Sequence, residues 1–99
     1  MPFVYMLQCA DGSYYTGSTI DLERRISEHQ FGQGAVYTRE RLPVALVWHA
    51  EFDRIDEAFG WEKRIQGWSR AKKRLLIEGR YGELAGWSAR QRASRERDG

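Results

Sequence analysis

Hydrophobic and polar positions alternate in two short stretches near the N-terminus. Residues 3–9 and 14–18 are rich in aromatic and β-branched side chains, and the residues between them, 10–13, read Ala-Asp-Gly-Ser, a typical turn sequence. These stretches predict a β-hairpin. A later apolar run, 44–48, continues with alternation to Phe52 and predicts a third strand that is buried.

Elsewhere in the chain, apolar residues recur at the three- to four-residue spacing of a helix. Asp21 and Ser69 are the expected N-caps of the first and third helices, whereas the glycine-containing stretch 32–41 is expected to be a loop. The predicted helices span residues 22–31, 56–66 and 70–78. The order β-β-α-β-α-α predicts an α+β fold of the broader α/β class, with helices packed on a three-stranded, mainly antiparallel sheet.

The length of 99 residues indicates one domain. We expect this domain to occupy residues 1–80 and a C-terminal extension to occupy 81–99, with a short helix followed by a frayed tail. A single cysteine, Cys9, excludes an intrachain disulfide and a zinc cluster and favours a reducing compartment. The N-terminal residues resemble neither a signal peptide nor a membrane span, so we expect a cytoplasmic protein with no membrane partner.

The hairpin decides whether Tyr5 and Tyr15 share a face of the sheet. A three-residue loop with Gly12 in a left-handed conformation pairs Tyr5 with Gly17 and points both tyrosines the same way. A two-residue Asp11-Gly12 loop puts them on opposite faces. We predict the three-residue loop, although core packing is the ordinary use of buried tyrosines. Gly17 would then let another group approach the strand closely.

Three polar residues interrupt the apolar faces of the predicted helices. Arg25 and His29 lie on the stripe of the first helix, either facing the sheet or lying at the edge of the stripe with their tips in water. Glu62 falls in the middle of the second helix's stripe, which we expect to comprise Ile55, Ala58, Phe59, Ile65 and Gln66. A buried carboxylate requires a cation or a metal, and a structural salt bridge, with Arg25 as one candidate partner, is the simpler alternative.

The formal net charge of +2 hides an uneven distribution. Residues 1–61 hold five Lys/Arg against nine Asp/Glu, whereas residues 62–99 hold eleven against five. The third helix contributes Arg70, Lys72 and Lys73 to this excess, which suits contact with a nucleic-acid backbone or is an ordinary solvated face. Ser18, which precedes a helix N-terminus, is a second candidate for phosphate contact.

Taken together, these residues resemble the GIY-YIG nuclease family and, more narrowly, its small stand-alone bacterial members. The resemblance covers residues 2–80 and rests on several spaced motifs: Phe3-Val4-Tyr5, Tyr15-Thr16-Gly17-Ser18-Thr19, Arg24-Arg25-Ile26, Glu28-His29, Glu62-Lys63 and Trp68-Ser69-Arg70. The first motif reads Phe-Val-Tyr in place of Gly-Ile-Tyr. Many family members carry an Asn after the glutamate, and this chain contains no Asn.

The resemblance implies cleavage of DNA phosphodiester bonds with one divalent metal ion, Mg²⁺ or Mn²⁺, in DNA processing such as DNA repair. It implies the catalytic residues Tyr5, Tyr15, Arg25 and His29, with Glu62 as the metal ligand. The expected DNA contacts are Gly17, Ser18, Arg24, Arg70, Lys72 and Lys73, and branched or single-stranded DNA is a candidate substrate.

Two other functions remain open on the sequence. The chain could be a nucleic-acid-binding module with the nuclease fold and weak or no catalysis. It could also be a protein-interaction domain that uses its tryptophans, Trp48, Trp61, Trp68 and Trp87, although no specific motif favours this.

Overall fold

The computed structural model describes residues 1–86, which divide into two compact units at the Gly67–Trp68 boundary. Trp87 and the rest of the predicted frayed tail lie outside the described residues. The short helix expected after residue 80 is present over 81–86. The division of the chain at residue 80 stays a prediction.

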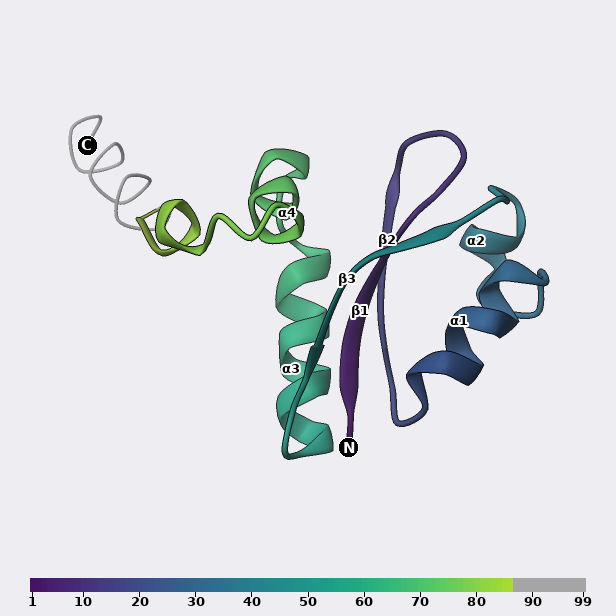
Figure 1. Cartoon of the computed structure of the whole chain (residues 1–99), viewed down its shortest axis with the longest axis horizontal. Helices are drawn as coiled ribbons and strands as arrows, with labels where there is room; N and C mark the ends of the chain where they lie inside the picture. The colour runs from purple at the N-terminus through teal and green to yellow at the C-terminus, as the bar shows by residue number, and fades with distance from the viewer. Residues whose placement is uncertain (87–99) are drawn as a thin grey trace. The chain divides into compact units, whose positions relative to one another are not determined.

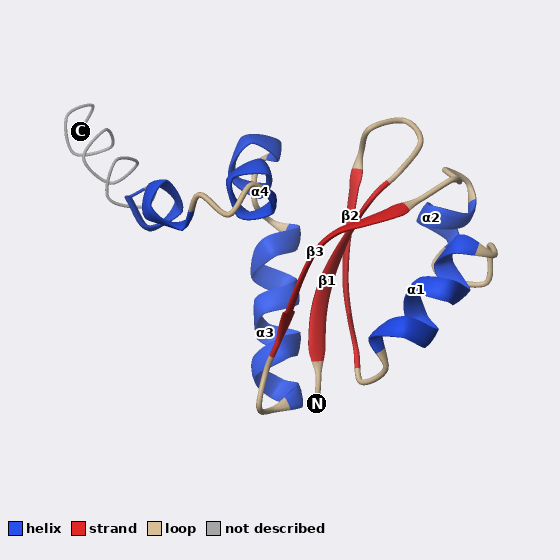
Figure 2. Cartoon of the chain, viewed as in Figure 1, coloured by secondary structure: helices blue, strands red, loops and turns tan. Residues whose placement is uncertain are grey.

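The first unit contains a three-stranded sheet in which every pairing is antiparallel. Strands β1 (Phe3–Gln8), β2 (Tyr14–Thr19) and β3 (Ala45–Glu51) are arranged in the order β2-β1-β3. Helices lie on both faces of this sheet, with α1 and α2 on one side and α3 on the other (Figures 1 and 2). The predicted fold class is therefore confirmed.

The hairpin adopts the three-residue loop. The Cys9 N–H donates to the Ser13 carbonyl at 2.8 Å, and the Gly12 N–H donates to the Cys9 carbonyl at 2.9 Å. Gly12 has a φ of 85°, a left-handed conformation that glycine adopts without a steric penalty. The register consequently places Tyr5 opposite Gly17, as predicted.

Besides the segment 81–86, the described residues form helices α1 (Leu22–Gln30) and α2 (Val36–Arg39), which lie between β2 and β3 in the chain, and α3 (Ile55–Gln66) and α4 (Arg70–Ile77), which follow β3. Asp21 and Ser69 cap α1 and α4 as expected, because each side chain accepts a hydrogen bond from a backbone N–H of the first turn. The short α2 was missed, since four residues after two glycines show no usable periodicity.

Two expectations about burial are wrong. Strand β3 is an edge strand and is largely exposed, with Leu46 37% accessible, because α3 packs against β1 and β2 instead. On α3, Ile55 and Phe59 are 67% and 54% accessible. The buried positions of this helix are Ala58, Glu62 and Ile65, whose i, i+4, i+7 spacing defines the face that contacts the sheet.

The hydrophobic core lies on both faces of the central strand β1. Tyr5, Leu7, Cys9 and Val44 form one buried cluster, against which Tyr15, Leu22 and Ile26 pack. Val4 and Met6 alternate with Tyr5 and Leu7, so they face α3. None of the helices described, over residues 1–86, is both long and apolar enough to cross a bilayer.

Gly17 is the position in the sheet most sensitive to a side chain. A Cβ there would lie 2.5 Å from the Tyr5 hydroxyl oxygen and 3.2 Å from Tyr15 Cε1. We expect Gly17→Ala to lower the free energy of unfolding by roughly 1–3 kcal/mol, because buried rings must shift to make room. Urea denaturation measures this change.

Gly60→Ala in α3 is the matched control. A Cβ at Gly60 meets no atom within 4 Å, and the position is an exposed helix interior. Alanine should therefore raise the unfolding free energy by about 0.5–1 kcal/mol. Equal effects at the two glycines would contradict the close contact between Tyr5 and β2.

Candidate active site

A buried chain of hydrogen bonds connects strand β1 to helices α1 and α2. The Tyr5 hydroxyl lies 2.7 Å from His29 Nε2, and His29 Nδ1 lies 2.8 Å from Thr38 Oγ1. The Thr38 hydroxyl donates to the Ala35 carbonyl at 2.9 Å, so it accepts from His29. His29 therefore carries its proton on Nδ1, and its Nε2 accepts the Tyr5 hydroxyl proton.

Burial determines the protonation states in this chain. Tyr5 is 1% accessible and His29 is fully buried. Desolvation raises the pKa of Tyr5 to about 12, even though the nearby Arg25 guanidinium favours the phenolate. Desolvation, assisted by Arg25, lowers the pKa of His29 to about 4. Both groups are consequently neutral at pH 7, and Tyr5 is a hydrogen-bond donor.

Two glycines make room for these rings. Gly17 lies against the Tyr5 ring, and a Cβ at Gly34 would collide with the His29 imidazole. The loop that carries Gly34 thus packs directly on the buried histidine. The sequence analysis did not single out Thr38 or Gly34. The available signal was the position of Gly34, a glycine a few residues after His29 on the predicted helix.

Tyr15 differs from Tyr5 in its exposure. Its side chain is only partly buried, and its ring contacts His29, Tyr5 and Tyr37 with centroid separations of 5.2, 6.4 and 6.1 Å. No residue within 1–86 forms a hydrogen bond with its hydroxyl. Tyr15 is therefore held by ring packing, with its polar end available to a ligand.

Arg25 presents a partly exposed cation beside the tyrosines. Its Nη1 lies 3.3 Å from Glu28 Oε1, one turn along α1, and 32% of the side chain is accessible. Interaction with the Tyr5 hydroxyl raises the pKa of Arg25, with a smaller contribution from Glu28. A guanidinium has five N–H donors, so these contacts leave others for an anion.

Glu62 is 8% accessible and its carboxylate is held at both oxygens. Oε1 accepts from Ser18 Oγ at 2.6 Å, and Oε2 accepts from Gln66 Nε2 at 3.1 Å. Lys63 Nζ lies 3.4 Å from Oε2. The carboxylate is thus compensated without Arg25, which excludes the Glu62–Arg25 salt bridge as the reason for its burial.

Glu62 reaches this region from the other side of the sheet. Neighbouring strand residues alternate faces, so Ser18 points towards α3 while Gly17 and Tyr15 point towards α1. The two faces meet at β2, an edge strand. The charge of Glu62 still acts on Tyr5, whose pKa it raises slightly. Candidate site residues therefore lie on both faces of the sheet at β2.

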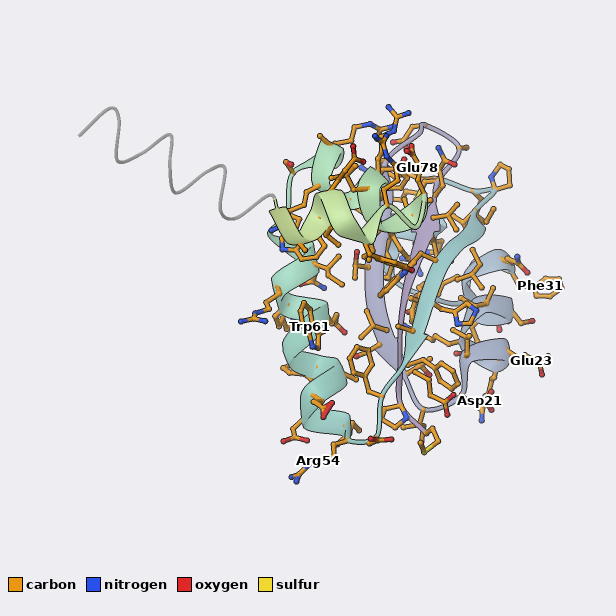
Figure 3. The ribbon with its side chains drawn as sticks, turned by 60° about the vertical axis from the view of Figure 1, so that its left-hand side comes forward. Asp21, Glu23, Phe31, Arg54, Trp61 and Glu78 are labelled. Carbon is orange, nitrogen blue, oxygen red and sulfur yellow. The ribbon has the colours of Figure 1, made fainter. Side chains whose placement is uncertain are left out.

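The other predicted contact residues are dispersed. Arg24 is exposed on α1, and its Nε lies 3.9 Å from Glu28 Oε2. Arg70, Lys72 and Lys73 lie on α4 in the second unit, where Lys72 covers the Trp68 ring at 4.3 Å. Figure 3 shows Phe31 at the end of α1 pointing away from the ribbon.

Comparisons with known proteins identify the family to which the sequence belongs. The sequence matches the family described as the GIY-YIG catalytic domain over residues 1–75. The chain belongs to this family. GIY-YIG domains are nuclease-type domains that act on DNA and generally use divalent metal ions.

Relatives of this GIY-YIG chain include a UPF0213 protein of Halobacterium salinarum, 50% identical over 77 residues, or 78% of this chain and all of the relative. Among solved structures, a UPF0213 protein from Bacillus halodurans is similar with a TM-score of 0.52 and 47% identity, covering 79% of this chain and 84% of that one. A protein from E. faecalis is similar with a TM-score of 0.54 and 34% identity, covering 80% and 84%.

The donor set of this GIY-YIG site suits one hard divalent cation. Each carboxylate oxygen of Glu62 has two lone pairs, and Ser18 and Gln66 each occupy one of them. Over residues 1–86, no three His, Cys, Asp or Glu side chains gather as a ligand group. Mg²⁺ tolerates one protein carboxylate because it keeps several waters and binds substrate phosphate, so the residues fit it better than Zn²⁺.

The buried His29 should make stability depend on pH. Unfolded His29 gains a proton near pH 6.5, whereas the folded chain holds its pKa at about 4, so the unfolded state binds more protons between these values. The unfolding free energy should fall by on the order of 2–3 kcal/mol as the pH drops from 7 to 4.5. Urea denaturation at the two pH values measures it.

His29→Gln and His49→Gln separate this effect from general acid sensitivity. His49 lies on the exposed edge strand β3. The pH dependence should shrink in the first variant and persist in the second. An unchanged dependence in His29→Gln would show that the imidazole is not the group responsible.

Proposed function

We propose that this chain is a divalent-metal-dependent endonuclease that hydrolyses DNA phosphodiester bonds with low sequence specificity. The observation that carries the proposal is that Arg25 and Glu62 both act on the Tyr5 hydroxyl, while Tyr15 packs on the Tyr5 ring. A phosphodiester substrate needs a water-orienting group, a cation at its oxygens and a metal ligand, and Tyr15, Arg25 and Glu62 supply that set.

Arg25 is the phosphate-binding residue in this proposal. Its guanidinium is partly exposed, and one nitrogen is already held by Glu28, so the planar group is oriented before the substrate arrives. Its remaining N–H groups can donate to two phosphate oxygens at once. Charge that develops on the phosphate is then met by a fixed cation.

The two tyrosines have different roles. Tyr5 is buried and donates to His29, so it positions other groups and does not touch DNA. Tyr15 is the more accessible of the two, and its hydroxyl oxygen accepts a hydrogen bond from the attacking water. His29, which is fully buried, is a positioning residue beneath Tyr15.

Glu62 is the residue that would hold Mg²⁺ or Mn²⁺. Its hydrogen bonds to Ser18 and Gln66 fix the direction of the carboxylate before a cation binds. When bound, the ion supplies charge neutralisation at the phosphate and acidifies coordinated water. Ser18 thereby supports the metal ligand, in addition to its position beside the α1 N-terminus.

Contacts with the DNA backbone explain the low specificity. The cations of α4, Arg70, Lys72 and Lys73, and the exposed Arg24 suit phosphates, which carry no sequence information. We propose branched or single-stranded DNA as the substrate and a cytoplasmic role in DNA repair. The alternative is a binding module with weak catalysis, which the complete absence of Asn favours.

Cleavage of plasmid and branched DNA with Mg²⁺ or Mn²⁺ tests the proposal. Glu62→Gln and Arg25→Ala should each lower the cleavage rate by about 10²–10³-fold, since each removes charge stabilisation from the transition state. Chelation of the metal should abolish cleavage by the wild-type protein.

Glu57→Gln is the matched control, because Glu57 is an exposed carboxylate on the same helix, and its rate should match that of the wild type. Cleavage that survives in Glu62→Gln and Arg25→Ala would refute the assignment. Salt-sensitive DNA binding without cleavage would favour the binding module.

Paired phenylalanine variants distinguish the tyrosines. Tyr15→Phe should lower the cleavage rate by about 10²-fold or more and leave the unfolding free energy nearly unchanged, because the lost hydroxyl has no protein partner among residues 1–86. Tyr5→Phe should cost about 1–3 kcal/mol of stability, since His29 Nε2 loses its buried donor. The reverse pattern would assign Tyr5 to the substrate.

A further inference from the structure

A row of side chains reaches from the hairpin turn to Tyr15. Asp11 in the turn accepts from Arg41 Nε at 3.2 Å, and the Arg41 Cζ lies 3.8 Å above the centre of the Tyr37 ring. Tyr37 in turn stacks on Tyr15 with an interplanar angle of 26°. These contacts join segments that are far apart in the sequence.

Asp11 and Arg41 are each anchored by further hydrogen bonds. Asp11 Oδ1 accepts two hydrogen bonds from Ser13, one from the backbone N–H at 3.0 Å and one from the hydroxyl at 2.6 Å. The carboxylate is therefore fixed within the turn. Arg41 Nη1 donates to the Tyr37 carbonyl at 3.0 Å. The guanidinium is therefore bound at two edges while its face covers the ring.

Tyr15 has no comparable anchor of its own. No residue within 1–86 forms a hydrogen bond with its hydroxyl, and its ring is located by contacts with Tyr5, His29 and Tyr37. Tyr5 and His29 are immobilised by burial and hydrogen bonds. Tyr37 is 38% accessible and depends on Arg41.

We propose that Arg41 is a positioning residue for Tyr15, acting through Tyr37, and that Asp11 holds Arg41 in place. The inference rests on the proposed role of Tyr15 in orienting water. A misplacement of about 1 Å can cost ~10²-fold in rate, so a group that fixes this ring affects catalysis without touching DNA.

The test compares Arg41→Ala, Arg41→Lys and Asp11→Asn with the wild type. The backbone bond from the Ala10 N–H to the Arg41 carbonyl, 3.0 Å long, does not involve these side chains and should keep the turn attached in every variant. Arg39→Ala and Asp53→Asn are the matched controls, since both side chains are exposed and neither belongs to the row.

Single-turnover cleavage should slow by roughly 10- to 100-fold in Arg41→Ala and Asp11→Asn, with KM unchanged. Arg41→Lys should not restore the wild-type rate, because an ammonium lacks the planar face and the second donor edge of a guanidinium. The Asp11→Asn/Arg41→Ala double variant should be no slower than the slower single variant. Tyr37→Phe, which keeps the ring, should retain the wild-type rate.

Ring signals of Tyr15 in protein with ¹³C-labelled tyrosine give a second readout that does not depend on activity. They should shift or broaden in Arg41→Ala and Asp11→Asn and stay fixed in the two controls, with assignment from the signal lost in Tyr15→Phe. If the wild type cleaves no DNA, the proposed function fails, whereas these signals still decide the positioning role.

A role for Arg41 in binding DNA predicts a different result. Arg41→Ala would then raise KM and reduce the salt dependence of DNA binding by about one counterion, while Asp11→Asn would leave both unchanged. Unchanged Tyr15 signals in Arg41→Ala would also overturn the proposal.

Discussion

The hydrogen bond between Tyr5 and His29 is the interaction on which the site depends. It joins the central strand to α1 inside the core, and the second nitrogen of the same imidazole bonds to Thr38 on α2. Both rings are desolvated, so an unpaired polar atom here would be costly. The bond therefore fixes where α1 lies on the sheet, and with it the direction of Arg25.

The residues that position the site are buried, whereas those that can contact a substrate are partly exposed. Tyr5 and His29 belong to the fold as much as to the chemistry, whereas Tyr15 and Arg25 reach the solvent. Glu62 belongs to neither group. It is buried on the opposite face of the sheet, where hydrogen bonds from Ser18 and Gln66 orient its carboxylate. A motif defined by five side chains thus contains three physical environments.

Much of the fold, and the burial of some candidate site residues, could be predicted from the sequence. The turn chemistry of Gly12 determined the hairpin register, and the interrupted apolar stripes identified His29 and Glu62 as buried polar groups. Thr38, the partner of His29, could not be predicted because it lies in a helix too short to show periodicity. The contact of Arg41 with Asp11 could not be predicted either, because it joins positions 30 residues apart. Helix phase was the other weak point, because Ile55 and Phe59 are apolar but exposed.

The three-residue turn has a consequence for the evolution of such domains. Side chains alternate along a strand with a period of two, so a slip of the pairing by one residue would send Tyr15 to the other face. A residue inserted within the turn leaves the Cys9–Ser13 pair and the face of Tyr15 unchanged, whereas one inserted between Ser13 and Tyr15 would reverse that face. Such domains should therefore tolerate changes in the length of the turn more readily than changes in the spacing from the turn to Tyr15.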